Sequence, residues 1–248
     1  MELRVLGSGS QGNGYLLVSN QDTLLIECGV KFSEVKRALD FDLSILSGCV
    51  ATHSHGDHFK YAKEVIAAGV DLYGSEGTYK ESGLKMTHRT HVITDQDTFC
   101  VGSFKILPFA VKHDTLEPLN FFIFHPEMGN LLFLTDTWYS AFKFKNLNQI
   151  MLEINYSEDI LNANTLSGRV SHFVANRIRT NHMELQTGKY LLLANDLSGV
   201  QNIVLLHLSD ANSNATEFKQ EIYKQTDIPT IVAERNTRIS LNRSPSNF

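Results

Sequence analysis

The sequence predicts an α/β protein of four layers, an αββα sandwich in which two β-sheets face each other between outer layers of helices. Runs of strand length, apolar or alternating and bounded by Gly, Asp, Asn or Pro, are grouped in each half of the chain. Helical patterns interrupt both groups and can cover the outside of the sheets. Because the 248 residues contain no internal repeat, low-complexity tract or linker, we expect one domain, residues 1–248.

The first half of the chain contributes most of the predicted strands and two predicted helices. The helices lie near residues 33–40 and 59–69, where apolar residues recur at helical spacing. The predicted strands are ELRVL (2–6), YLLVS (15–19), TLLIE (23–27), CVAT (49–52), HVIT (91–94), FKILPFAV (104–111), LNFFIF (119–124) and NLLFLT (130–135).

The second half alternates strands and helices. Its predicted strands are QIMLEI (149–154), NIVLLHL (202–208) and TIVAE (230–234). Residues 157–178 are predicted as one or two amphipathic helices, with Ser167 as a candidate N-cap, and further helices cover about 183–195 and 215–225. The polar, basic tail at 235–248 is expected to be loosely ordered.

Composition limits the classes of function. A net charge of −5 gives no overall basic field, so any contact with nucleic acid must use a local patch. Cys28, Cys49 and Cys100 are widely spaced among apolar neighbours, which favours buried free thiols over disulfides. The sequence has no signal-peptide pattern and no apolar run of transmembrane length, so we expect a cytoplasmic protein without membrane association.

The stretch THSHGDH, residues 52–58, brings together His53, His55, Asp57 and His58 between a predicted strand and a predicted helix. Side chains two apart on an extended backbone point to the same side, so the first two histidines can share one ion. Asp57 and His58 lie where the chain turns and can reach a second ion. Neutral imidazoles suit zinc and similar transition metals, and a carboxylate supplies compensating charge. The spacing therefore predicts half of a metal site.

Three further candidate ligands lie at the ends of predicted strands downstream. His113 follows FKILPFAVK, Asp136 follows NLLFLT, and His207 lies in IVLLHLSDANSN. A single histidine on an apolar strand is more often a hydrogen-bonded core residue. Ligands at several strand ends can converge on one rim of a sheet, however, so we predict that these three complete the site.

With these residues the sequence resembles the metallo-β-lactamase-fold hydrolases, whose H-x-H-x-D-H motif is followed by a later His, an Asp and a final His. Within that superfamily it resembles the YycJ/WalJ-like group, regarded as nucleases, through LGSGSQGN (6–13), THSHGDH and LLHLSDANSN (205–214). It is also related in pattern to tRNase Z and to phage anti-Pycsar phosphodiesterases. The resemblance implies the metallo-β-lactamase fold up to about residue 233.

The resemblance also implies roles for the candidate ligands. His53, His55 and His113 would hold one divalent metal ion, Asp57, His58 and His207 a second, and Asp136 would bridge both. Zinc is the first expectation for both ions and manganese the alternative. Water bound between two such ions is acidified to a metal-bound hydroxide nucleophile, and the ions can clamp the oxygens of a phosphodiester. Asp57 and His182 are the residues that the resemblance makes catalytic.

His182 lies in NHMELQTG (181–188), which resembles a His-containing motif upstream of the final metal-binding His. By resemblance its imidazole contacts the scissile phosphate or protonates the leaving oxygen. Asn181 and Glu184 depart from the Gly and Ser of the family motif, and a carboxylate at 184 would repel a phosphate unless a cation intervenes. Glu27 stands where the family usually has Asp, and we expect it to accept hydrogen bonds that orient the metal-binding loop.

Two segments are candidates for substrate binding. In LGSGSQGN, Ser8, Ser10 and Asn13 can offer polar groups to a phosphate. We favour the structural interpretation, in which the glycines allow a tight hairpin, and the loop can serve both purposes. Arg177 and Arg179, shortly before His182, are the local candidates for phosphate recognition, and a solvated helix face is an equally good interpretation.

Three functions therefore remain open. The first is hydrolysis of phosphodiester bonds in nucleic acid by a binuclear metal-dependent enzyme, acting at a nucleic-acid end. The second is a phosphodiesterase of small or cyclic nucleotides, of the anti-Pycsar type, which suits the acidic net charge and can act as a homodimer. The third is a non-catalytic metal-binding module, which the full set of seven ligands disfavours.

Overall fold

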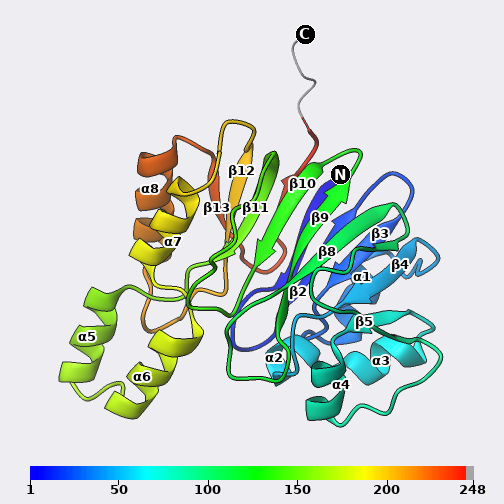
Figure 1. Ribbon diagram of the computed structural model, residues 1–248, viewed down its shortest axis with the longest axis horizontal. Helices are drawn as coiled ribbons and strands as arrows, with labels where there is room; N and C mark the ends of the chain where they lie inside the picture. Colours follow the sequence, from blue (N-terminus) through cyan, green and yellow to red (C-terminus); the bar gives the residue numbers. More distant parts are fainter. Residues whose placement is uncertain (244–248) are drawn as a thin grey trace.

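Two seven-stranded sheets form the centre of the computed structural model, which describes residues 1–243 (Figure 1). The first sheet has the strand order β14-β1-β2-β3-β4-β5-β6, and the second has the order β13-β12-β11-β10-β9-β8-β7. The strands of the first sheet are β1 (Glu2–Gly7), β2 (Gly14–Val18), β3 (Thr23–Ile26), β4 (Leu46–Val50), β5 (Leu72–Gly74), β6 (Thr90–Val92) and β14 (Arg238–Ser240). Those of the second are β7 (Phe99–Val101), β8 (Phe104–Ala110), β9 (Leu119–His125), β10 (Gly129–Leu134), β11 (Leu147–Glu153), β12 (Asn202–Leu206) and β13 (Thr230–Val232).

Both sheets are mixed in the same way. Each begins with antiparallel pairs along the chain, β1 to β3 in the first sheet and β7 to β10 in the second. Each continues with parallel pairs, β3 to β6 and β10 to β13. The carboxyl ends of parallel strands meet at one edge of a sheet, so the loops that leave β4, β10, β11 and β12 can bring polar residues together there.

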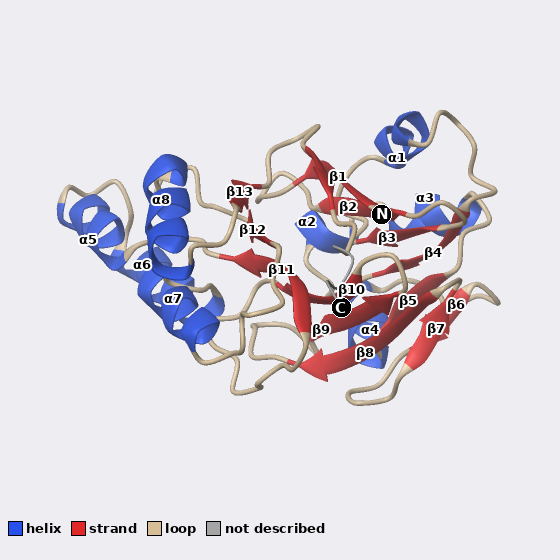
Figure 2. Cartoon of the chain, turned by 90° about the horizontal axis from the view of Figure 1, so that it is seen from above, coloured by secondary structure: helices blue, strands red, loops and turns tan. Residues whose placement is uncertain are grey.

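Helices cover the outer side of each sheet, which completes the predicted four layers (Figure 2). Apolar side chains of α1 (Phe32–Ala38), α3 (Ala62–Ala67) and α4 (Glu76–Ser82) share a buried core with the first sheet. Those of α7 (Leu185–Leu193) and α8 (Ala215–Thr226) share another with the second sheet. A third core lies between the sheets and includes Leu17, Phe104 and Phe133. The αββα fold class predicted from the sequence is therefore confirmed.

Several local features differ from the sequence prediction. The single helix expected at 59–69 is two short helices, α2 (Gly56–Phe59) and α3. The segment 157–178 contains α5 (Glu158–Leu166) and α6 (His172–Asn181), and their N-caps are Ser157 and Ser171. Ser167 is the C-cap of α5, so its assignment as an N-cap was wrong: the side chains of the other two serines accept the orphan amide hydrogens.

The C-terminal segment is more ordered than expected as far as the structure describes it. Arg238–Ser240 forms β14, which pairs antiparallel with Glu2, Leu3 and Arg4 of β1 at the edge of the first sheet. The expectation of a loose tail therefore does not hold for residues 235–243, and residues 244–248 lie outside the described part.

The burial of the cysteines and the absence of membrane-spanning helices were also predicted from the sequence. Cys28 and Cys49 are buried free thiols as predicted, but Cys100 is exposed, because it lies on β7 at the edge of the second sheet. Among the helices described, none is both long and apolar enough to cross a lipid bilayer.

Candidate metal centre

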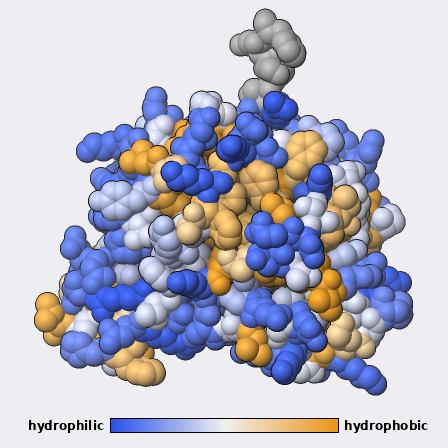
Figure 3. Space-filling view, in the orientation of Figure 1, coloured by the Kyte–Doolittle hydropathy of each residue, from blue (hydrophilic) through white to orange (hydrophobic). Residues whose placement is uncertain are grey.

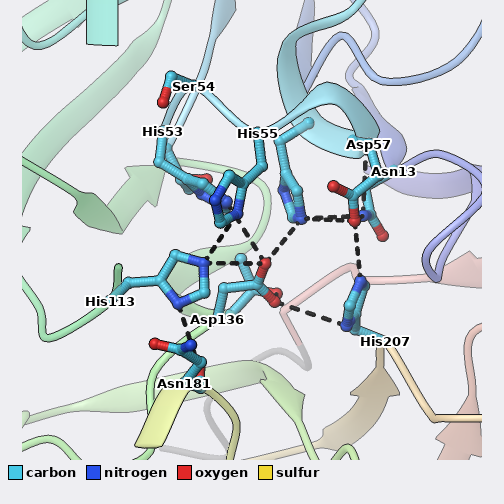
Figure 4. Close-up of polar contacts among 12 residues, drawn as sticks. Asn13, His53, Ser54, His55, Asp57, His113, Asp136, Asn181 and His207 are labelled. Carbon is cyan, nitrogen blue, oxygen red and sulfur yellow. Dashed lines mark hydrogen bonds and ion pairs between the residues drawn. The ribbon is translucent and has the colours of Figure 1, made fainter. Parts of the chain in front are cut away.

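The seven predicted ligands lie together where loops from both sheets meet (Figure 4). His53 and His55 follow β4, and the next two ligands, Asp57 and His58, lie in α2. The remaining three follow strands of the second sheet: His113 comes after β8, Asp136 after β10 and His207 after β12. The apolar strands are thus buried, and the polar residue at the end of each strand faces the common site.

The potential ligand atoms form two groups that share one carboxylate. One group consists of His53, His55, His113 and Asp136, and the other of Asp57, His58, His207 and Asp136, with one ligand atom of each residue within 4.8 Å of the others. These are the two sets predicted from the sequence.

Asp136 lies at the centre of the arrangement. Its Oδ2 is 2.9 Å from His58 Nε2 and 3.4 Å from His53 Nε2, while its Oδ1 is 3.5 Å from His207 Nδ1. The Nε2 of His113 is 3.1 Å from His55 Nδ1, and the Nε2 of His207 is 3.2 Å from Asp57 Oδ2. One carboxylate therefore faces imidazoles of both groups, as a bridging ligand would.

Two residues of the centre have a backbone conformation that L-residues rarely adopt. Asp136 has a φ of 46° and His207 a φ of 50°. Such left-handed conformations are unfavourable for residues other than glycine, and they concentrate at functional sites where the surroundings enforce them. Here they turn the chain sharply at the ends of β10 and β12, and both side chains point into the cluster (Figure 4).

Burial and close charges strongly shift the pKa values in the cluster. Burial alone would raise the pKa of Asp136, but the nearby His207 and His58 hold it well below its usual value. Burial would lower the pKa of His207, but the facing carboxylates, Asp136 first, raise it to about 10. The carboxylates therefore attract positive charge into a buried place, and a bound cation could supply that charge.

The donor set fits a divalent metal ion. His53 is 1% exposed, its Nε2 has no hydrogen-bond partner among the described residues, and burial holds its pKa well below the usual value, so the imidazole is neutral. A neutral, buried imidazole nitrogen without a hydrogen bond costs free energy unless it binds something, and coordination to a metal ion satisfies it. Imidazoles combined with carboxylates are the ligands preferred by zinc and related transition metals.

Glu27 and Asn13 hold the metal-binding loop in place. Glu27 is fully buried; its carboxylate accepts hydrogen bonds from the hydroxyl and amide of Thr52 and lies 3.3 Å from His58 Nδ1. This is the orienting role expected for Glu27. Asn13 is also fully buried, and its amide lies within 3.0 Å of His58 Nε2 and 3.4 Å of Asp57 Oδ2.

The position of Asn13 differs from the sequence prediction. We expected its side chain to face a substrate phosphate. Instead its amide nitrogen faces Asp57 and His58, while its Oδ1 accepts hydrogen bonds from the backbone of Gly9 and from Tyr15. Its polar atoms are thus used inside the protein, and it positions the loop.

One acidic residue at the centre, Glu153, was not predicted from the sequence. It is the last residue of β11 and is fully buried. Its Oε1 is 2.7 Å from His182 Nδ1 and 3.3 Å from His207 Nδ1, while its Oε2 accepts a hydrogen bond from the amide of Thr137. Burial would lower the pKa of His182, but Glu153 raises it. Glu153 ends a strand beside those that lead to Asp136 and His207, so the same strand-end rule identifies it.

The remaining predicted residues differ in how they lie relative to this centre: the cavity that Ser10 lines includes none of the seven candidate ligands. Ser10 is exposed in the loop after β1 and lines a cavity of about 760 Å³. Arg177 donates to Asp114 Oδ2 at 3.0 Å, and Asp114 Oδ1 is 3.5 Å from His55 Nε2, so this guanidinium is next to the cluster. Arg179 donates bidentate hydrogen bonds to the carboxylate of Glu158. Of the two arginines, only Arg177 is directed towards the centre.

Glu184 does not act as the free carboxylate that the sequence suggested. Its side chain caps the N-terminus of α7 by accepting hydrogen bonds from the amides of Gln186 and Thr187. Negative charge at a helix N-terminus is favourable, and these amides offset part of the repulsion that a phosphate would meet.

The layered fold and the His/Asp cluster define a protein of the metallo-β-lactamase fold. No protein-family profile matches the sequence. Among characterised relatives, the exodeoxyribonuclease WalJ of Streptococcus pneumoniae is 25% identical over 224 residues, which cover 84% of this chain and 82% of that one. The exodeoxyribonuclease YycJ of Bacillus anthracis is 28% identical over 174 residues, 65% of each chain.

Solved structures show the same fold. The metallo-β-lactamase fold protein YhfI from Bacillus subtilis superimposes with a TM-score of 0.72 at 15% identity, over 96% of this chain and 99% of that one. The short form of human tRNase Z superimposes with a TM-score of 0.63 at 15% identity, over 97% and 99% of the two chains. The chain is thus similar to the WalJ/YycJ exonucleases in sequence and has the metallo-β-lactamase fold throughout.

Proposed function

We propose that this protein is a metal-dependent phosphodiesterase that hydrolyses DNA from a strand end. The observation that carries the proposal is the double cluster centred on Asp136, with the Glu153–His182 pair beside it. The similarity to exodeoxyribonucleases over 84% of the chain supports DNA as the substrate class. The two ligand groups support two metal ions, for which zinc is the first candidate and manganese the second.

The proposed chemistry divides between the metal centre and neighbouring side chains. Divalent cations held by the cluster would neutralise the charge of a phosphodiester and acidify water. Asp57 contributes a carboxylate whose pKa stays low beside His207 and His58, although burial opposes this, so it is ionised and can orient the attacking water. Arg177, next to Asp114, remains the candidate for contacting the substrate phosphate from the rim.

His182 is the proposed source of the leaving-group proton. Its Nδ1 lies 2.7 Å from Glu153 and donates a hydrogen bond to that carboxylate, which leaves Nε2 as the nitrogen that can face a substrate. The carboxylate favours the protonated imidazole, so the side chain can deliver a proton to the departing oxygen. His182 is 21% exposed on its side chain, whereas Glu153 is 1% exposed, as expected for an acid and the residue that positions it.

A substrate panel tests the proposal. Protein reconstituted separately with zinc and with manganese is incubated with single-stranded DNA, duplex DNA, RNA, cyclic mononucleotides and bis(p-nitrophenyl) phosphate. We expect chelator-sensitive release of mononucleotides from DNA ends. Absence of phosphodiester hydrolysis with either metal, at confirmed metal loading, would refute the proposal.

The second candidate is a phosphodiesterase of small or cyclic nucleotides. The net charge of −5 favours it, because a mononucleotide needs few basic contacts. In the same panel it predicts that a cyclic mononucleotide is hydrolysed with a kcat/KM higher than that for any DNA substrate.

A further inference from the structure

An exposed aromatic loop begins directly after the central aspartate. Trp138 is 39% exposed and Tyr139 is 48% exposed, two and three residues beyond Asp136. Their rings lie side by side, with centroids 5.7 Å apart and an angle of 33° between the planes. Large aromatic rings bury much apolar area when they pack inside a protein, so two adjacent rings left in water indicate a surface that binds something.

The loop is anchored at both ends, so the exposed rings are not the result of a loose segment. At the start, the Thr137 hydroxyl donates to the carbonyl of Tyr139, and the Thr137 amide donates to Glu153. Further along, the ring of Phe144 stacks on Phe122 of β9, with centroids 5.6 Å apart. Figure 3 shows apolar side chains gathered over β8, β9 and β10, strands of the sheet on which Phe144 packs. The anchors hold Trp138 and Tyr139 towards solvent.

Positive charge accompanies the rings. Lys112 Nζ lies 5.6 Å from the centroid of the Trp138 ring, a cation–π geometry, and Lys112 directly precedes His113 of the metal centre. Lys143 and Lys145 are exposed in the same loop. Within residues 1–243, none of these three lysines forms an ion pair with an acidic side chain. One of these cations, Lys112, thus lies against an exposed aromatic ring, although the net charge of the chain is −5.

We propose that Trp138 and Tyr139, with Lys112, form a stacking platform for unpaired bases of a DNA strand whose phosphate reaches the metal centre. This inference rests on the proposed function and deepens it by naming single-stranded DNA, or an unwound end, as the bound form. Aromatic rings stack on any base, and lysines attract the phosphates between the bases. The platform is joined to the centre by two short connections, Asp136 to Trp138 and His113 to Lys112.

Charge and geometry favour single-stranded DNA on this platform over a duplex, a second copy of this chain or a mononucleotide. A duplex keeps its bases stacked on each other, so its bases cannot lie on Trp138 unless the end opens. A second copy of this chain carries the same cationic loop, so a contact between the two loops would bring charges of the same sign together, which is electrostatically unfavourable. A mononucleotide can cover one ring at most, so the two adjacent rings favour at least two successive bases.

The single tryptophan of the sequence makes the test direct, because all tryptophan emission comes from Trp138. The full chain, loaded with zinc, is titrated with an eight-nucleotide single strand whose phosphorothioate linkages resist hydrolysis, and with the matching blunt duplex. Base stacking on the ring should quench the emission with the single strand at concentrations at least 10-fold lower than with the duplex. Equal quenching by both forms, or none, would overturn the proposal.

Variants measured by anisotropy of a labelled strand supply the second test. Trp138→Ala should weaken binding of the single strand by about 5- to 150-fold, the range for loss of one base–aromatic stack, and Trp138→Phe should restore most of it. Lys112→Ala should lower the slope of log affinity against log salt by about 0.7, one phosphate contact on a single strand. Tyr223→Ala removes a half-exposed aromatic ring on α8 and serves as the matched control, with unchanged binding.

The outcomes separate this inference from the proposed function. If the single strand quenches Trp138 and Trp138→Ala weakens binding, but no phosphodiester is hydrolysed, the platform stands and the proposed function fails. If DNA is hydrolysed and Trp138→Ala keeps the wild-type KM and affinity, the platform fails and the proposed function stands. Emission that changes with protein concentration alone would instead assign the rings to self-association and refute the platform.

Discussion

Replacement of Glu153 by glutamine tests whether this buried carboxylate positions His182 for proton transfer. The substitution keeps the shape of the side chain and its acceptor for the Thr137 amide, but it removes the negative charge 2.7 Å from His182 Nδ1. A hydrogen bond to a charged group contributes about 1.5 to 3 kcal/mol. If that free energy is lost from the transition state alone, kcat falls about 10- to 150-fold. Direct loss of the acid, His182→Ala, should cost about 10²- to 10⁴-fold.

Three measurements separate positioning from a structural or metal-binding role. The metal content of Glu153→Gln, determined by elemental analysis, should equal that of the wild type. Its rate with bis(p-nitrophenyl) phosphate, whose leaving group needs no proton, should recover much of the loss seen with DNA. The double variant with His182→Ala should be no slower than His182→Ala alone, because both changes remove one function.

Other results would refute this reasoning. If Glu153→Gln loses a metal ion, Glu153 and His182 belong to the third potential ligand group, with Asp136 and His207, and the acid–base interpretation is wrong. If the activated substrate is slowed as much as DNA, the residue acts on the fold of the centre and not on the leaving group.

The remaining predictions concern the metals, the substrate and the stability of the fold. Asp136→Ala should remove metal from both ligand groups and abolish activity, and wild-type metal content in this variant would show that Asp136 is not the bridge. Binding of long duplex DNA should be weak, with a slope of log affinity against log salt shallower than about −3, because few basic residues lie near the centre; a slope near −6 in an anisotropy series would contradict this. Asp22→Asn should lower stability by about 1 to 2 kcal/mol at pH 7, since Asp22 accepts hydrogen bonds from the Ser103 amide at 2.6 Å and the Ser19 hydroxyl at 2.7 Å. Burial opposes ionisation of Asp22, but these hydrogen bonds lower its pKa, so the difference in unfolding free energy should be present above the usual Asp pKa of about 4 and should be lost as the pH falls below it, through the lowered pKa of the folded state.

The sequence predicted the layers and the cluster of candidate metal ligands because each rests on a local pattern. Strands such as β9 and β10 are long and apolar, and the ligands Asp136 and His207 stand at the ends of such strands. Because the ends of these strands were expected to meet at one edge of a sheet, the His and Asp residues there were predicted to form one cluster. The three-residue strands β5, β7 and β14 escaped prediction, because so short a run shows little alternation. The strands β6 and β13 are as short, but they overlap the longer apolar runs HVIT and TIVAE, which were predicted.

The direction in which polar side chains point could not be predicted in the same way. Asn13 and Ser10 lie in one glycine-rich loop, yet the first is fully buried against Asp57 and His58 while the second is exposed. Likewise, Arg177 and Arg179 are two residues apart on α6, and their partners, Asp114 and Glu158, come from distant segments. Whether such a side chain is buried, and which partner it contacts, depends on tertiary contacts that no local sequence pattern encodes.

The pairing of Arg238–Ser240 with β1 has a consequence for how the protein avoids association. Without β14, the free backbone groups of β1, a six-residue strand with buried Leu3 and Val5, would form the outer edge of the first sheet and could pair with other chains. With β14 in place, the edge is a strand of three residues that carries an exposed arginine. Short, charged edges are poor templates for further strands. By covering the edge of β1, the segment 238–240 should limit strand pairing between chains and hence aggregation. A truncated form of the chain should therefore keep residues 238–240.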